Sequence, residues 1–176
     1  AMTLLPTGGG KSICFQVPVL AQEGIGIVIS PLIALMKDQV ENLTKRGIKA
    51  IAIYSGMTAR EIDVALDNCV YGNVKFLYVS PERITTTLFR ERLKKMNVTL
   101  IAIDEAHCIS QWGYDFRPSY LKIPEIKELV KEDVPFLAVT ATANKRVARD
   151  IVASLGFEKK NVFKQSFERK NLGYLV

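Results

Sequence analysis

Short apolar runs alternate with longer segments of helical period along this chain, and this alternation limits the folds that it can adopt. The runs are rich in Ile, Val and Leu without polar alternation, which is typical of strands buried on both faces. Parallel strands need long crossover connections, usually helices. The sequence therefore predicts an α/β fold with a mostly parallel sheet covered by helices on both faces. We expect strands at residues 3–5, 25–30, 50–53, 74–79, 98–103 and 136–140.

Helix start and stop signals lie between these runs. Ser30 is expected as an N-cap, with Pro31 at the first helical position. Thr58 and Glu61 have the spacing of a capping box, and Gly156 follows the last apolar residue of a third periodic segment. These signals predict helices at residues 31–45, from residue 58 onward and at 144–155.

Size and composition fit one compact domain. The chain has 176 residues, of which 48% are hydrophobic and 24% charged, and these values exclude a disordered chain or a coiled-coil rod. The longest apolar stretch, residues 25–36, is too short and too interrupted to span a membrane. We take residues 1–176 as one domain. Because its first apolar run has only three residues, we expect the domain to be truncated at its N-terminus.

Charge and cysteine content narrow the choice of partners and compartment. The formal net charge is +6, and residues 141–176 hold eight basic groups against three acidic ones. This excess would suit a polyanion, but charge alone does not separate a nucleic-acid-binding domain from an ordinary basic one. The three cysteines have no C-x-x-C spacing and follow no signal peptide, which favours a reduced, cytosolic compartment and argues against a zinc site.

A glycine-rich segment, Pro6-Thr7-Gly8-Gly9-Gly10-Lys11-Ser12, follows the first run and opens a helical segment. Consecutive glycines let backbone N–H groups point at phosphate oxygens, and a helix N-terminus adds partial positive charge. Lys11 would reach the β- and γ-phosphates, and the Ser12 hydroxyl would bind Mg²⁺. The strict pattern requires Gly where this chain has Leu5. The alternative is a glycine-rich turn with an accidental lysine.

Two adjacent carboxylates, Asp104 and Glu105, end the apolar run at residues 98–103. Adjacent strand residues point to opposite faces, so we expect one carboxylate to face a metal and the other an attacking water. Such a pair alone is usually just solvated, but beside a phosphate loop it indicates phosphoryl transfer. His107 is the only histidine, and the sequence shows no nucleophile for it to serve.

Three motifs, residues 6–12, Asp104-Glu105-Ala106-His107 and Thr140-Ala141-Thr142, have the order and separations of superfamily 2 helicases. More narrowly, residues 30–40 and 108–118 resemble RecQ helicases, which carry the second stretch as an aromatic-rich loop. The resemblance covers essentially the whole chain. It implies a P-loop NTPase (RecA-like) fold and the first motor domain of an ATP-dependent DNA helicase. In this family ATP hydrolysis drives 3′-to-5′ translocation on single-stranded DNA and duplex unwinding during repair and recombination.

The resemblance also implies roles for individual residues. Asp104 and Ser12 would hold Mg²⁺, Glu105 would activate water, and His107 would relay to Thr140 and Thr142. The nucleotide would lie against Thr7, Gly8, Gly9, Gly10, Lys11 and Ser12. The residues expected to contact DNA or couple its movement to hydrolysis are Ser30, Pro31, Ser80, Arg83, Trp112, Phe116, Arg117, Thr140 and Thr142.

The aromatic residues Trp112 and Phe116 have two interpretations. An exposed aromatic side chain gains roughly 1–3 kcal/mol by stacking on a base without reading sequence, which suits a translocating motor. The alternative is that both rings pack in the core. Tyr114 stands where many RecQ relatives have His, so the resemblance assigns it no role.

The chain lacks the upstream adenine-binding motif of the family and its second RecA-like domain, which carries arginine fingers. Such an arginine contributes on the order of 10³ to 10⁵ in rate, so we expect the isolated domain to hydrolyse ATP slowly and to unwind nothing. Expected partners are single-stranded and partial duplex DNA and the second RecA-like domain, in a cytosolic monomer without membrane contact. Two other functions stay open: a nucleotide- and DNA-binding module without turnover, and a P-loop kinase of small metabolites. RNA also stays open as the nucleic acid.

Overall fold

A single parallel sheet organises the computed structural model, which describes residues 1–6, 8–113, 115–157 and 161–165. Its strand order is β3-β4-β2-β5-β6-β1-β7, and every strand pair among the described residues is parallel. The predicted α/β fold with a parallel sheet is therefore confirmed. The strands are β1 Met2–Leu4, β2 Ile25–Ile29, β3 Ala50–Ile53, β4 Phe76–Val79, β5 Val98–Ile103, β6 Phe136–Thr140 and β7 Val162–Lys164.

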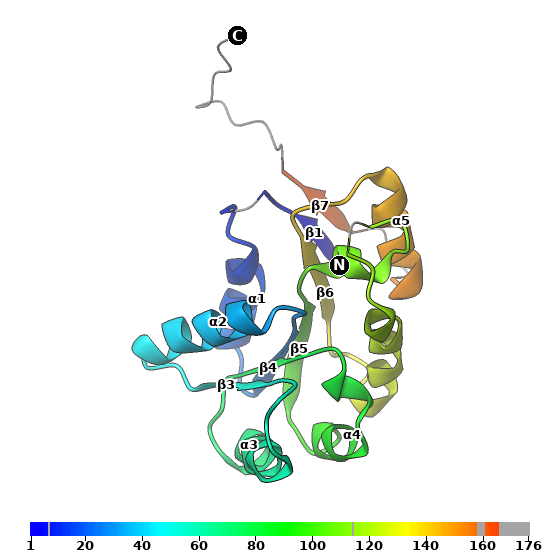
Figure 1. Ribbon diagram of the computed structural model, residues 1–176. Helices are drawn as coiled ribbons and strands as arrows, with labels where there is room; N and C mark the ends of the chain where they lie inside the picture. Colours follow the sequence, from blue (N-terminus) through cyan, green and yellow to red (C-terminus); the bar gives the residue numbers. More distant parts are fainter. Residues whose placement is uncertain (7, 114, 158–160, 166–176) are drawn as a thin grey trace.

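Helices cover both faces of this sheet (Figure 1). One face is covered by α1 and α2, and the other by α3, α4, η3 and α5. The α-helices are α1 Lys11–Leu20, α2 Ile33–Lys45, α3 Ala59–Tyr71, α4 Thr87–Leu93 and α5 Lys145–Ser154. Three 3₁₀ segments complete the described elements: η1 Arg83–Thr85, η2 Ala106–Ile109 and η3 Pro118–Leu129.

Strand residues alternate between two apolar clusters, one on each side of the sheet. In β2, Ile27 and Ile29 belong to the cluster under α3, α4 and α5, whereas Val28 packs with Phe15 and Val19 of α1. Successive strand side chains point to opposite faces, so a strand between two helical layers must be apolar throughout. This is why the continuous apolar runs identified the central strands.

Several local predictions differ from the structure. The helix expected at residues 31–45 begins at Ile33 with Leu32 as N-cap, so Ser30 is not a cap. The Ser30 hydroxyl instead donates a hydrogen bond to Asp104 Oδ2, 3.4 Å away. The predicted strand 50–53 was expected to be buried on both faces, but β3 lies at the sheet edge and is only partly covered. Neither α4 nor β7 was predicted.

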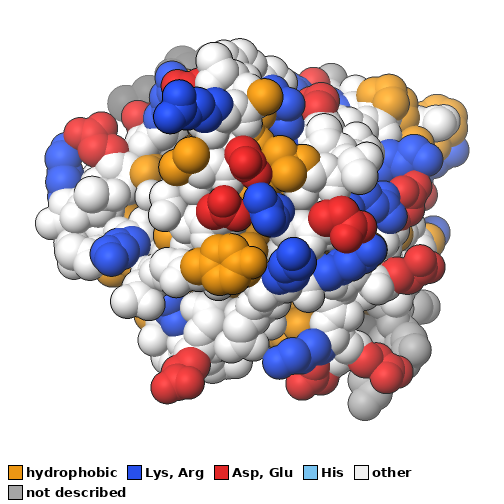
Figure 2. Space-filling view, turned by 90° about the horizontal axis from the view of Figure 1, so that it is seen from below, with side chains coloured by type: hydrophobic (Ala, Val, Ile, Leu, Met, Phe, Trp, Pro, Cys, Tyr) orange, Lys and Arg blue, Asp and Glu red, His pale blue; other side chains and the backbone are white. Residues whose placement is uncertain are grey.

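The face viewed from below, on the side of α3 and α4, carries charges of both signs (Figure 2). Blue and red side chains lie next to one another there, with hydrophobic side chains between them. Arg92, for example, lies 2.8 Å from Asp63 and 3.0 Å from Asp67. The positive net charge therefore does not gather on the part of this face that the structure describes. Within the same described part of the chain, no helix is long and apolar enough to cross a membrane.

The capping box of α3 is formed as predicted and provides a test of local stability. The Glu61 N–H donates to Thr58 Oγ1, and the Thr58 N–H donates to Glu61 Oε2. Thr58→Ala should lower the free energy of unfolding by about 1 kcal/mol, because a helix N-terminal donor loses its acceptor. Urea denaturation measures the change. Thr87→Ala, in the exposed first turn of α4, is the control, and equal midpoints for the two variants would contradict the assignment.

Candidate active site

The glycine-rich segment curls onto the N-terminus of α1. Gly10 is the N-cap with φ 80°, a left-handed conformation that glycine adopts without strain. Gly9 donates its N–H to Pro6 O at 2.8 Å, and a Cβ on Gly9 would lie 2.8 Å from that oxygen. Among the described residues no side chain caps α1, and Gly10 O accepts the Ile13 N–H at 3.0 Å, so the Lys11 and Ser12 N–H groups are left for another acceptor. Thr7, expected to contact nucleotide, lies outside the described residues.

A cleft brings the loop and the acidic pair together. Lys11, Ser12, Asp104 and Glu105 all line a cavity of about 220 Å³. The cavity lies where β2 and β5 end, because Ser30 follows β2 and Asp104 follows β5. Ligands of open parallel sheets bind at this carboxyl edge. Lys11 and the two carboxylates therefore face one cleft.

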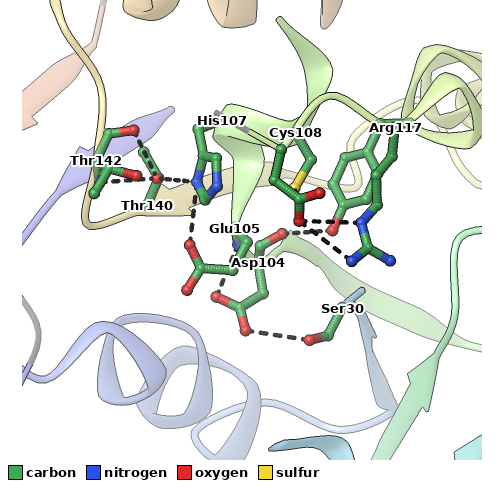
Figure 3. Close-up of polar contacts among 10 residues, drawn as sticks. Ser30, Asp104, Glu105, His107, Cys108, Arg117, Thr140 and Thr142 are labelled. Atoms are coloured by element: carbon green, nitrogen blue, oxygen red, sulfur yellow. Dashed lines mark hydrogen bonds and ion pairs between the residues drawn. The ribbon is translucent and has the colours of Figure 1, made fainter. Parts of the chain in front are cut away.

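Asp104 is a partly buried carboxylate with few compensating contacts. The Glu105 N–H donates to its Oδ1 at 2.9 Å, and Ser30 donates to Oδ2 (Figure 3). Burial, and then the neighbouring charge of Glu105, raise the pKa of Asp104 to about 6, although Lys11 acts in the opposite direction. A carboxylate whose negative charge is this poorly compensated is suited to a cation.

Glu105 lies beyond the strand, so the expected alternation of faces does not apply. β5 ends at Ile103, and Glu105 has φ 46°, the only positive φ outside glycine among the described residues. This left-handed residue turns the chain so that both carboxylates line the same cleft, which corrects the prediction of opposite faces. The hydrogen bond with His107 is the main cause that lowers the pKa of Glu105.

His107 connects the acidic pair to β6. Its Nδ1 lies 3.2 Å from Glu105 Oε2 and 2.9 Å from Thr140 Oγ1. Thr140 Oγ1 in turn accepts from the Thr142 N–H at 3.2 Å, and Figure 3 shows Thr142, Thr140 and His107 side by side, with Glu105 below the His107 ring. Thr140 is fully buried, so its side chain lies within the protein and Thr142 is the exposed member. The motif residues expected to act together are thus in contact.

Among its described residues, the loop after η2 presents one aromatic side chain to solvent. Trp112 is 60% exposed, so the core-packing alternative is wrong for this residue. Phe116 is only partly exposed, and Tyr114 lies outside the described residues. Arg117 donates to Pro31 O at 3.2 Å and to Asp115 Oδ2, also at 3.2 Å, which ties the loop to the segment that follows β2.

Other residues expected to contact a strand lie deeper. Ser30 is 2% and Ser80 3% exposed, and Pro31 is buried as well. Ser30 points at Asp104, so its side chain belongs to the cleft rather than to a surface that a strand could reach. Within the described part of the chain, the buried Ser80 hydroxyl has no hydrogen-bond partner. Arg83, partly exposed, donates to Tyr54 O at 3.3 Å.

Sequence reasoning missed a polar group in the same cleft. Gln39 and Tyr78 line the cavity, and Gln16 Nε2 donates to Gln39 Oε1 at 3.0 Å and to Tyr78 Oη at 3.4 Å. Burial raises the pKa of Tyr78 to about 12, which keeps it a neutral phenol. The available signal was spacing, because Gln16 follows Ser12 by one helical turn and therefore shares its face of α1.

Comparisons with known proteins agree with this geometry. The family model described as DEAD/DEAH box helicase matches residues 1–151. The chain is 47% identical over 98% of its length to the ATP-dependent DNA helicase RecQ of Bacillus subtilis, of which it covers 29%. It is 42% identical over 96% of its length to the ATP-dependent helicase wrn-1 of Caenorhabditis elegans, of which it covers 16%. The chain thus spans less than a third of the length of these relatives.

Solved structures show the same fold. The Hef helicase domain of Pyrococcus furiosus aligns with 96% of the chain and 35% of its own length at a TM-score of 0.70 and 19% identity. The yeast DEAD-box splicing factor Prp28 aligns with 88% of the chain and 39% of its own length at a TM-score of 0.67 and 20% identity. The fold is the RecA-like P-loop NTPase fold, and with the family match this leads to one conclusion. The chain belongs to the DEAD/DEAH box helicase family.

Proposed function

We propose that this chain is the ATP-binding motor domain of a DNA helicase of the RecQ type. The observation that carries the proposal is the cleft that holds Lys11, Ser12, Asp104 and Glu105 at the carboxyl edge of the sheet. In the full-length protein, ATP hydrolysis would drive 3′-to-5′ movement on single-stranded DNA and unwinding of partial duplexes in repair and recombination. The RecQ relatives are named ATP-dependent DNA helicases, which supports DNA as the substrate.

The residues of the cleft divide the work of ATP hydrolysis. Gly8, Gly9 and Gly10 would cradle the phosphates with backbone N–H groups, and the Lys11 ammonium would neutralise their charge. Glu105 keeps a lowered pKa, so its carboxylate is ionised at neutral pH and can accept a proton from an attacking water. His107 orients that carboxylate through the 3.2 Å contact.

The donor set of the cleft fits Mg²⁺. This ion prefers oxygen ligands and is usually held by one or two protein groups together with substrate phosphates. Asp104 supplies a partly buried, poorly compensated carboxylate, and the Ser12 hydroxyl comes from the first turn of α1. When bound, the ion would neutralise charge that develops on the phosphate oxygens.

Coupling between nucleotide and DNA would run through the contact of His107 with Thr140. This contact joins the acidic pair to the segment that carries the exposed Thr142. Trp112, Phe116 and Arg117 would meet the strand from the neighbouring loop, with Arg83 as a further contact. Arg117 already links this loop to Pro31.

The full-length protein would complete the machinery. We propose a second RecA-like domain that supplies arginines to the γ-phosphate, in a monomer of the bacterial cytosol. The three free cysteines, Cys14, Cys69 and Cys108, support a reducing compartment. Without the second domain, hydrolysis by this chain should be slower by on the order of 10³ or more.

Two substitutions in the full-length protein separate binding from hydrolysis. Lys11→Ala should weaken ATP binding because a phosphate-neutralising charge is lost. Glu105→Gln should retain binding and lower hydrolysis by about 10² or more, because the amide cannot accept the proton. Binding is measured with a fluorescent ATP analogue and hydrolysis by phosphate release. Lys95→Ala, an exposed lysine after α4, is the control.

Wild-type hydrolysis in either site variant would overturn the assignment. ATP binding by the wild type without DNA-stimulated turnover would instead favour the nucleotide- and DNA-binding module.

The raised pKa of Asp104 predicts a pH-dependent cost to stability. The folded pKa is about 6 against a model-peptide value of 3.8, so the free energy of unfolding falls as pH rises from about 4 to about 6, where the unfolded state has already lost this proton, and stays at the lower value above pH 6. Asp104→Asn should therefore be more stable than the wild type at pH 8, by roughly 3 kcal/mol at most. The difference should vanish below pH 4, where both side chains are neutral. Urea denaturation at a series of pH values measures it, and a pH-independent difference would contradict the prediction.

The exposed position of Trp112 predicts a role in the response to DNA. Trp112→Ala should weaken single-strand binding by the full-length protein roughly ten-fold, because a base loses its stacking partner. DNA-stimulated hydrolysis should fall by more than hydrolysis without DNA. Tyr71→Ala removes another exposed aromatic ring, at the end of α3, and serves as the control. Equal losses with and without DNA would show that Trp112 is structural.

A further inference from the structure

Two residues of α5 are linked to Trp112, one by direct contact with its ring and one, through Ser110, with its backbone N–H. The guanidinium carbon of Arg146 lies 3.5 Å from the centroid of the Trp112 ring. Asp150 Oδ2 accepts a hydrogen bond of 2.7 Å from the Ser110 hydroxyl, whose oxygen accepts the Trp112 N–H at 3.2 Å. Arg146 and Asp150 are one helical turn apart, so both reach the loop from the same face of α5.

The contact leaves one face of the indole open. A guanidinium carbon 3.5 Å from the ring centroid is in van der Waals contact with that face, so a base cannot stack there. Trp112 is nevertheless 60% exposed, so its exposed surface must include the opposite face. The indole is thus a platform with one occupied side and one free side.

The elements on both sides of this contact are themselves anchored. Ser110 donates its N–H to His107 O at 3.1 Å and accepts from the Gly113 N–H at 2.9 Å, so the Trp112 turn is closed on η2. At the other side, Asn144 Oδ1 accepts the N–H groups of Arg146 and Val147, both at 2.9 Å. The arginine therefore sits in the capped first turn of α5, directly after the segment that carries Thr140 and Thr142.

We propose that Arg146 and Asp150 are positioning residues that hold Trp112 as a one-sided stacking platform for a base of single-stranded DNA. Arg146 occupies the inner face of the ring, and Asp150 fixes the backbone through Ser110. A ring that is already oriented loses less conformational freedom when a base stacks on it. This inference rests on the proposed function, because it assumes that a strand reaches this loop.

Fluorescence tests the contact without DNA, because Trp112 is the only tryptophan of the 176-residue chain. Arg146→Ala should raise the acrylamide quenching constant about two-fold, since the second ring face opens. Arg146→Lys keeps the positive charge but not the planar group, so its quenching constant should lie between those of the wild type and Arg146→Ala. Arg149→Ala is the matched control: it removes the same charge from the same helix, and Arg149 lines a groove with Val152 and Phe157 instead.

Asp150→Asn should also raise quenching, because the Ser110 anchor weakens. Equal acrylamide quenching in the wild type, Arg146→Ala and Asp150→Asn would overturn the inference, whatever the outcome with DNA.

Titration with an oligothymidine tests the platform itself. A stacked base should quench the Trp112 fluorescence of the wild type, and Arg146→Ala should weaken this binding about five-fold more than Arg149→Ala does. Equal weakening in the two variants would show that Arg146 acts by charge alone and would overturn the inference. Tighter binding in Arg146→Ala would overturn it too, because Arg146 would then block the face that bases use. If oligothymidine binds the wild type without quenching, the strand contact of the proposed function fails, and the acrylamide result still decides whether Arg146 and Asp150 orient the ring.

Discussion

The shared edge at which parallel strands end is the constraint on which the whole site depends. β2, β5 and β6 deliver Ser30, Asp104 and Thr140 to this edge, and α1 begins beside it with Lys11. Parallel pairing makes this convergence unavoidable, because every carboxyl end points the same way. The cleft also brings Lys11 close to both carboxylates. Lys11 acts to lower the pKa values of both, yet burial still raises the pKa of Asp104. The site is therefore held by packing of the sheet and not by its own electrostatics.

One strained residue makes the two carboxylates different. A left-handed backbone outside glycine costs on the order of 1 kcal/mol or more and persists only where the surroundings hold it. Around Glu105, the Asp104 carboxylate accepts the Glu105 N–H, and the His107 ring contacts the Glu105 side chain. Consequently the pKa of Asp104 is raised, whereas the hydrogen bond with His107 lowers the pKa of Glu105. The same His107 nitrogen also contacts Thr140 Oγ1, so one side chain connects Glu105 to β6.

The sequence predicted what depends on burial and local spacing. The apolar runs located six strands because both helical layers cover the sheet, and the capping box at Thr58 depends on residues three apart. β7 was not predicted because this edge strand has only three residues, and its two apolar side chains, Val162 and Phe163, are too few to form an apolar run. The N-cap predicted at Ser30 failed because its hydroxyl has a competing partner, Asp104, from another strand. Asp104 lies 74 positions from Ser30 in the sequence, so a local sequence pattern cannot predict this hydrogen bond.

Trp112 shows why a motif can identify a residue without explaining its orientation. The stretch at residues 108–118 pointed to this ring, but the groups that orient it come from α5, on the far side of β6 in the sequence. In the sequence, Arg146 and Asp150 look like ordinary charges on an exposed helix. They acquire a role only because the turn at Ser110 packs against the first two turns of that helix. The segment that carries Thr140 and Thr142 leads directly into α5. The helix that orients the Trp112 ring is therefore joined along the chain to the strand that contacts His107. A displacement of β6 would therefore move the ring and the His107 contact together.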